Sequence, residues 1–171
     1  MVRIFPLIFV LLWSSAFITT KPIIDYSDPF AALAFRFLFV SLGFFIFSYF
    51  TKKNIKSSKE NILQSIFSGI LFHGFYLGGV FYSISIGMPT GITALIVTLQ
   101  PVLTNILAGP LLKEKVNTSQ WIGMILGFSG AALVLGFDIG DSLPILGVIA
   151  AFISLFAITF STLWQKKAAN N

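Results

Sequence analysis

This sequence contains six long apolar segments, which are separated by short polar or charged connections. An α-helix rises about 1.5 Å per residue, so about 20 apolar residues cross a hydrocarbon core of about 30 Å. The pattern predicts an all-α polytopic membrane protein with six transmembrane helices, surrounded by a lipid bilayer. We place the helices at Ile4–Thr20, Phe30–Phe50, Ile62–Ile86, Thr90–Leu112, Trp121–Phe137 and Ile145–Trp164.

Proline-containing dipeptides predict where several of these helices end. Lys21-Pro22 follows the first segment, Asp28-Pro29 precedes the second, and Met88-Pro89 separates the third from the fourth. Proline lacks a backbone donor and disfavours helical backbone in the residue before it. We therefore expect helices to stop at these positions.

The composition excludes several classes of function. Of the 171 residues, 56% are hydrophobic and 10% are charged, whereas roughly a quarter are charged in soluble proteins. The chain has no cysteine, which excludes disulfides, thiolate metal sites and cysteine nucleophiles. Its net charge of +5 is carried by short clusters between apolar segments. This distribution is typical of membrane topology signals and argues against a nucleic-acid partner.

The connecting segments carry very different charges on the two sides of the predicted bundle. One side has only Glu60 and Glu114 against nine basic residues, which are Arg3, Lys52, Lys53, Lys56, Lys59, Lys113, Lys115, Lys166 and Lys167. The opposite side has Lys21 against four acidic residues, which are Asp25, Asp28, Asp138 and Asp141. Because cytoplasmic loops are enriched in lysine and arginine, we predict a plasma-membrane protein with both termini in the cytoplasm.

The segment Thr90–Leu112 has a proline at its centre and polar side chains around it. Pro101 frees the carbonyl group of Val97, which protein or water must then satisfy. We predict that this helix forms a wall of a substrate pathway. Alternatively, its threonine hydroxyls bond only to their own helix. The candidate pathway residues here are Thr93, Val97, Gln100, Pro101 and Asn105.

His73 is the only histidine, and it lies deep within the third segment. On a helical projection it shares one narrow stripe with Tyr76 and several small residues. We predict that His73 and Tyr76 line the substrate pathway, because ionisable groups inside a membrane are usually functional. The alternative is that His73 makes one hydrogen bond between helices and fixes their packing. A proton-handling role is a further hypothesis.

Arg36 lies about two turns inside the second segment, near the predicted external surface. Pairing with Asp25 or Asp28, or extension toward the headgroups, explains it without a substrate. A site that attracts anions together with Lys21 is the alternative.

Several stretches together resemble one known family. These are LLWSSAFITTK (Leu11–Lys21), LAFRFLF (Leu33–Phe39) and TALIVTLQPVLTNILAGPLLKEKVNTSQWIGMILGFSGAALVL (Thr93–Leu135). They resemble helices of the EamA-type drug/metabolite transporter superfamily. The resemblance implies that the polar residues of the first helix face a cavity, so Trp13 and Ser14 join the candidate pathway residues. Core packing is the alternative for Trp13.

The resemblance also implies a domain organisation. Residues 1–137 correspond to one five-helix EamA-like unit. Residues 138–171 correspond to a loop, the first helix of an incomplete second unit and a cytoplasmic tail. The family's two units have opposite orientations, as inverted repeats do. We therefore expect a partner chain or a missing second half, and expect the polar faces of the last helix and of the third and fourth helices to meet lipid in a lone chain.

The motifs of enzymes and ATP-driven pumps are absent from the sequence, including the P-loop, HExxH, GxSxG and GxGxxG patterns. We therefore predict no enzyme activity, no catalytic residues, no cofactor and no metal. The leading hypothesis is a secondary carrier of small organic solutes. The alternatives are a membrane subunit that does not transport, and a truncated or half-size chain without independent activity.

Overall fold

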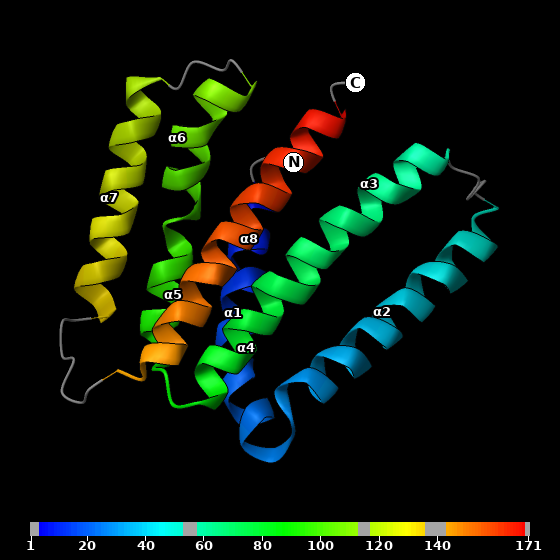
Figure 1. Ribbon diagram of the computed structural model, residues 1–171, viewed down its shortest axis with the longest axis horizontal. Helices are drawn as coiled ribbons and strands as arrows, with labels where there is room; N and C mark the ends of the chain where they lie inside the picture. The colour runs from blue at the N-terminus through cyan, green and yellow to red at the C-terminus, as the bar shows by residue number, and fades with distance from the viewer. Residues whose placement is uncertain (1–3, 53–57, 113–116, 136–142, 170–171) are drawn as a thin grey trace.

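The computed structural model describes residues 4–52, 58–112, 117–135 and 143–169. These residues form helices that make six passes in alternating directions (Figure 1). The structure confirms the all-α polytopic fold. The helices are α1 (Phe5–Tyr26), α2 (Pro29–Phe50), α3 (Lys59–Gly69), η1 (Ile70–Leu77), α4 (Gly78–Ser85), α5 (Thr90–Thr98), α6 (Gln100–Leu112), α7 (Thr118–Leu135) and α8 (Ile145–Ala169).

Five of the six passes are long and apolar enough to cross a membrane over their described residues. They are α1, α2, the continuous pass from α3 through α4, the pair α5 and α6, and α8. The remaining pass is α7, which is described as far as Leu135. The charged connection at residues 113–115 and residues 138–142 of the predicted turn at 138–144 lie outside the described residues.

The predicted end of the first helix at Lys21-Pro22 is wrong. Pro22 lies inside α1, which continues to Tyr26. A proline inside a helix removes one backbone hydrogen bond, and membrane helices tolerate this loss when neighbouring groups satisfy the freed carbonyl. The chain turns instead at Ser27, and the Asp28 side chain accepts hydrogen bonds from the first backbone N–H groups of α2.

The predicted interruption at Pro101 is confirmed. The helix α5 ends at Thr98, and Leu99 caps it through a hydrogen bond from its N–H to the Ile96 carbonyl. Pro101 then occupies the second position of α6, where no helical N–H is required.

The third pass contains a π-helix that the sequence did not predict. The segment η1 has eight residues in π-helical geometry between the regular helices α3 and α4. Such segments are rare and occur frequently at functional sites. This one carries His73 and Tyr76.

The last helix, α8, lies in the middle of the layer of helices, between the pair α5 and α6 and the pass from α3 to α4 (Figure 1). It packs against α3, η1, α4, α5 and α6. Ser154, Thr159 and Ser161 of α8 are fully buried. The expectation that this polar face meets lipid is therefore wrong, because its hydroxyl groups find partners within the chain.

Two described contacts show how α8 is held. The Ser161 hydroxyl donates to the Ser68 carbonyl at 3.1 Å. The Gln100 side-chain amide donates to the Thr162 hydroxyl at 3.4 Å. The polar faces of the third and fourth passes are buried only in part: Val80 and Thr93 are buried, whereas Ser65, His73 and Pro101 are exposed. Small and hydroxylated residues favour such packing because they let helices approach closely and bond across the interface.

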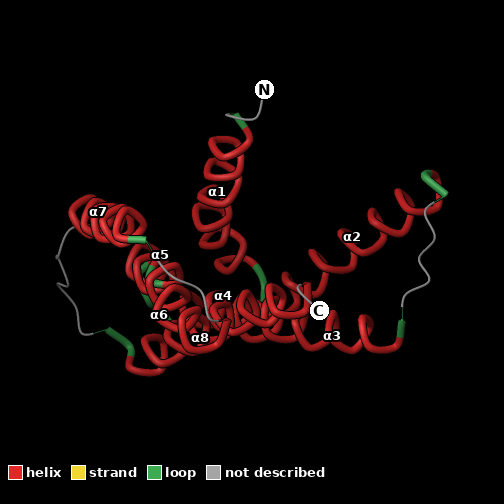
Figure 2. Tube along the Cα trace, turned by 90° about the horizontal axis from the view of Figure 1, so that it is seen from above, coloured by secondary structure: helices red, strands yellow, loops and turns green. Residues whose placement is uncertain are grey.

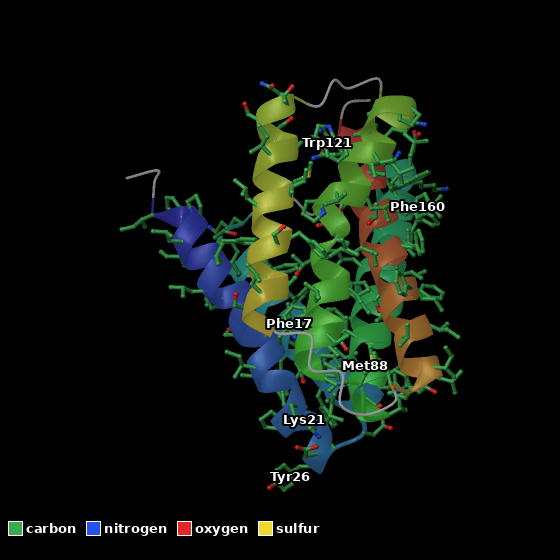
Figure 3. All side chains as sticks on the ribbon, turned by 90° about the vertical axis from the view of Figure 1, so that its left-hand side faces the viewer. Phe17, Lys21, Tyr26, Met88, Trp121 and Phe160 are labelled. Carbon is green, nitrogen blue, oxygen red and sulfur yellow. The ribbon has the colours of Figure 1, made fainter. Side chains whose placement is uncertain are left out.

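The two ends of the bundle differ in the residues they present. Lys21 and Tyr26 lie at one end of the molecule, and Trp121 lies at the opposite end (Figure 3). The described lysines Lys59 and Lys166 belong to the end that contains Trp121, since their passes begin or finish there. Viewed along the passes, α1 stands away from the layer formed by α3, α8, α5 and α6 (Figure 2).

Candidate functional site

A cavity of about 660 Å³ lies between α1, α2 and the pass that contains η1 and α4. We call it the α1–α2 cavity. Its volume falls within the range of about 300–1,000 Å³ that is usual for small-molecule sites. About half of the residues that line it are aromatic. The aromatic lining residues are Phe9, Trp13, Phe17, Phe37, Phe44, Phe72, Tyr76 and Phe81.

Trp13 lines this cavity from α1, about 12 Å along the helix from its first residue at about 1.5 Å per residue. Its ring lies 6.3 Å from the Phe72 ring in an edge-to-face arrangement, and 5.3 Å from the Phe9 ring. Edge-to-face contacts of this kind are favourable between aromatic groups. Ser14 is exposed and is not among the lining residues.

The π-helix η1 places His73 and Tyr76 in the same cavity. The His73 ring lies 4.7 Å from the Phe37 ring of α2 and 5.1 Å from the Phe72 ring. Among the described residues His73 makes no side-chain hydrogen bond, so aromatic contacts orient its imidazole. Tyr76 is buried, with its ring 5.3 Å from that of Phe72.

Arg36 also lines the α1–α2 cavity, from α2. The pairing predicted with Asp25 or Asp28 is wrong. Asp25 forms an ion pair with Lys21, and Asp28 caps the N-terminus of α2. Because both nearby carboxylates are engaged, no described carboxylate forms an ion pair with Arg36.

A second, more polar pocket of about 610 Å³ lies between α3, η1 and the end of α8. Phe72 and His73 line both this pocket and the α1–α2 cavity. The polar pocket contains a hydrogen-bonded cluster in which the Gln165 amide donates to the hydroxyls of Ser68 and Ser161, at 2.6 and 3.2 Å. The segment around His73 therefore separates an aromatic cavity from a polar one.

The candidate residues of α5 and α6 lie apart from the α1–α2 cavity. The Thr93 hydroxyl is 3.3 Å from the Ser83 hydroxyl, and Val97 is buried in the apolar core. The Asn105 amide contacts the Met124 sulfur at 2.8 Å. The Gln100 amide reaches α8, as described above, and Pro101 is exposed. In this structure the buried or bonded members of the set connect helices, and their pathway role stays a prediction.

The arrangement suits binding better than covalent chemistry. No group of three or more metal-ligating side chains is present among the described residues. The single histidine contacts aromatic rings instead of a hydroxyl that it could activate. An aromatic wall with a few polar groups can instead hold and orient a small organic molecule.

Comparison with known proteins decides the family. The sequence profile of the EamA-like transporter family matches residues 3–136. The chain belongs to the EamA-like transporter family. The match ends before α8, so this helix lies outside the matched region.

Two bacterial relatives of this EamA-like protein illustrate the similarity. The uncharacterized transporter YvbV of Bacillus subtilis is 28% identical, over 94% of this chain and 52% of its own length. The uncharacterized transporter YdfC of the same organism is 26% identical, over 91% of this chain and 50% of its own length. The chain thus spans about half the length of these relatives. No solved structure matches it.

The family and the apolar helices make this EamA-like chain a multi-pass membrane protein of the transporter type. The candidates Trp13, His73 and Tyr76 come together in one cavity, although Trp13 belongs to α1 and the other two belong to η1. Phe37 and Phe72 line the cavity as well, and the sequence does not predict them as site residues. Nothing distinguishes them from the other phenylalanines among the 20 in the chain, since their role depends on the packing of α2 against η1.

Proposed function

We propose that this protein is a secondary carrier, or one part of such a carrier, that moves small organic solutes through the α1–α2 cavity. One observation supports this proposal most strongly. Trp13, His73 and Tyr76 line the same cavity of about 660 Å³ in a chain that belongs to a transporter family. The polar pocket beyond His73 continues this space toward the opposite end of α3. Solutes that use both spaces would pass the Phe72–His73 segment.

We further propose that the protein lies in the plasma membrane with both termini in the cytoplasm. The clusters of lysine at one end of the bundle support this orientation. Because the chain has no cysteine, Lys59→Cys introduces a single label site. An impermeant thiol reagent added outside intact cells should leave Lys59→Cys unlabelled, and labelling there would reverse the proposed orientation.

The carrier function is tested by comparing cells that express the protein with cells that express cavity variants. Mass spectrometry of small molecules in the medium and in the cells should show at least one solute whose distribution depends on the protein. Trp13→Ala and Tyr76→Ala should abolish that difference, because each removes part of the cavity wall. Phe160→Ala is the matched control, since Phe160 is exposed on the outer face of α8 (Figure 3).

Two results would contradict the carrier function. One is an unchanged solute distribution in cells whose membranes contain the folded protein. The other is a solute difference that Trp13→Ala and Tyr76→Ala leave intact, which would place transport elsewhere in the molecule.

A second proposal is that transport requires another chain or a second half. It rests on the small buried fraction of α1 and α2, because a water-filled path needs protein on every side. The mass of the protein in lipid nanodiscs should correspond to more than one chain in the fraction that binds or transports solute. An active single chain would contradict this proposal while leaving the carrier function intact.

A further inference from the structure

The α1–α2 cavity has one permanent positive charge and no described carboxylate. Arg36 supplies the charge. The carboxylates of α1 and the α2 cap are engaged elsewhere, as described above, and Glu60 lies in the first turn of α3. A guanidinium group presents a fork of donors that matches the two oxygens of a carboxylate. The charge of the cavity therefore favours an anionic ligand.

The walls next to Arg36 favour a ligand with a flat apolar body. Phe37 follows Arg36 directly on α2 and lies against His73 at an interplanar angle of 60°. Trp13 meets Phe72 at 71°, and Trp13 is 38% exposed. Rings that meet edge-to-face leave flat faces on which a planar apolar group can stack. These faces and the guanidinium line one cavity.

Aromatic walls also attract cations, which makes a cationic ligand the main alternative. The faces of tryptophan and tyrosine stabilise ammonium groups at close range. Here a cation would also meet the fixed positive charge of Arg36, and no described carboxylate lines the cavity to offset it. Like charges in a partly apolar cavity repel strongly, because little water screens them.

We propose that the α1–α2 cavity selects small organic anions that combine one carboxylate-like group with a planar apolar body. The anionic group binds Arg36, and the apolar body lies among Trp13, Phe37 and Phe72. This substrate class rests on the carrier function proposed above. It excludes organic cations, and it ranks neutral compounds of the same shape below the anion.

Three probes with the same phenyl body and a three-carbon chain but different charge test this selectivity. They are 3-phenylpropanoate, its neutral amide 3-phenylpropanamide, and 3-phenylpropylammonium. Equilibrium binding is measured on the full chain in nanodiscs of phosphatidylcholine, with empty nanodiscs subtracted. We expect the anion to bind at least about tenfold more tightly than either analogue, since a charge-assisted hydrogen bond contributes about that factor.

Variants of Arg36 separate its charge from general packing. Arg36→Gln should remove the preference for the anion, while Arg36→Lys should retain part of it. Lys59→Gln is the matched control, because it removes a positive charge at the start of α3, away from the cavity. That control should bind all three probes as the unmodified protein does.

A lipid headgroup is another anion that Arg36 could bind, and a second membrane composition distinguishes this source. When about a third of the lipid is phosphatidylglycerol, a solute site should keep its preference for 3-phenylpropanoate, whereas a headgroup site should lose it. Loss of the preference would overturn the proposed substrate class. Equal or tighter binding of the amide or the ammonium compound would also overturn it, yet would leave the carrier function standing if Trp13→Ala removes that binding. Failure of all three probes to bind would overturn the proposed substrate class and leave the carrier function to the solute measurement described above.

Discussion

The helix α8 and the hairpin of α1 and α2 differ in how much of their surface is buried against the rest of the protein. Within their most apolar windows, 50% of the α8 residues are buried, against 6% for α1 and 6% for α2. Most of the buried residues of α8 are small or hydroxylated, such as Ala151, Ser154 and Thr159, and Leu155, Ile158 and Leu163 are buried with them. The hairpin instead exposes large side chains, and Leu33 is the one residue of α2 that is buried.

The difference follows from which contacts stabilise helix packing in a membrane. Lipid chains are as apolar as leucine or phenylalanine, so burying such side chains against protein gains little. Close packing arises where small residues let backbones approach and where hydroxyl groups find partners across the interface. The region around α8 meets both conditions, so we describe it as the fixed part of the protein. The hairpin has few buried residues, and we predict that it is the movable wall of the α1–α2 cavity.

The largest expected effect comes from filling the contact between α4 and α8. A Cβ atom on Gly79 would lie 3.0 Å from the Ala150 carbonyl oxygen and 2.3 Å from the Ser154 hydroxyl oxygen. Gly79→Val should therefore reduce the free energy of unfolding by about 1–3 kcal/mol or prevent folding. Gly74→Val is the control, since nothing lies within 4 Å of a Cβ atom there. Thermal unfolding in detergent measures both, and equal losses would contradict tight packing at α8.

A smaller loss is expected when one bond between helices is removed. The Ser83 hydroxyl donates to the Gly147 carbonyl at 2.8 Å, which ties α4 to α8. Ser83→Ala should lower the free energy of unfolding by about 0.6 kcal/mol, the average for such bonds in membranes. Ser65→Ala is the control, because the Ser65 hydroxyl bonds only to the Asn61 carbonyl of its own helix. A Ser83→Ala protein as stable as the control would show that α8 is held by packing alone.

Replacing His73 should leave stability nearly unchanged and alter the pH dependence of transport. Histidine titrates near pH 6.5 as a residue type, so we expect transport to vary between about pH 5.5 and 7.5. Tyr76 and Arg36 line the same cavity and stay unchanged in this variant. His73→Gln should therefore flatten the profile. A His73→Gln profile identical to that of the unmodified protein would remove His73 from the mechanism.

The smallest effect is expected on the outer face of the hairpin. Phe45 is 64% exposed and meets no part of the cavity. Phe45→Leu should change the free energy of unfolding by less than about 0.5 kcal/mol and leave transport unchanged, as surface substitutions usually do. Thermal unfolding and the solute measurement check this together. A large loss of either quantity would indicate that this face of α2 contacts another protein.

The sequence predicted the passes well because their signals are local. Apolar segments of about 20 residues and the break at Pro101 can be recognised without knowledge of neighbouring helices. The end of α1 was misplaced because whether Pro22 breaks the helix depends on what satisfies the freed carbonyl. The chain turns just before α2, where the Asp28 side chain accepts hydrogen bonds from the N–H groups of Phe30 and Ala31.

The arrangement around α8 and the free charge of Arg36 depend on tertiary contacts, so the sequence could not predict them. From the sequence the Ser161 hydroxyl is expected to face lipid, whereas in the structure it lies against the Ser68 hydroxyl. The sequence offers Asp25 as an ion-pair partner for Arg36, but in the structure Asp25 forms an ion pair with Lys21. The π-helix likewise has no sequence signature that separates it from a regular helix. Of the candidate site, the sequence predicted Trp13, His73 and Tyr76 as individual residues, but not the aromatic partners that bring them together.

The contrast between a fixed α8 and a movable hairpin is tested most directly by distances between spin labels in lipid. Two pairs share Phe160→Cys on α8, with either Phe47→Cys on α2 or Leu63→Cys on α3, and all three positions are exposed. We predict a broad distance distribution between α2 and α8 that shifts when 3-phenylpropanoate is added. The distribution between α3 and α8 should be narrow and should not shift. Equal widths for the two pairs, with neither responding to the solute, would contradict the account.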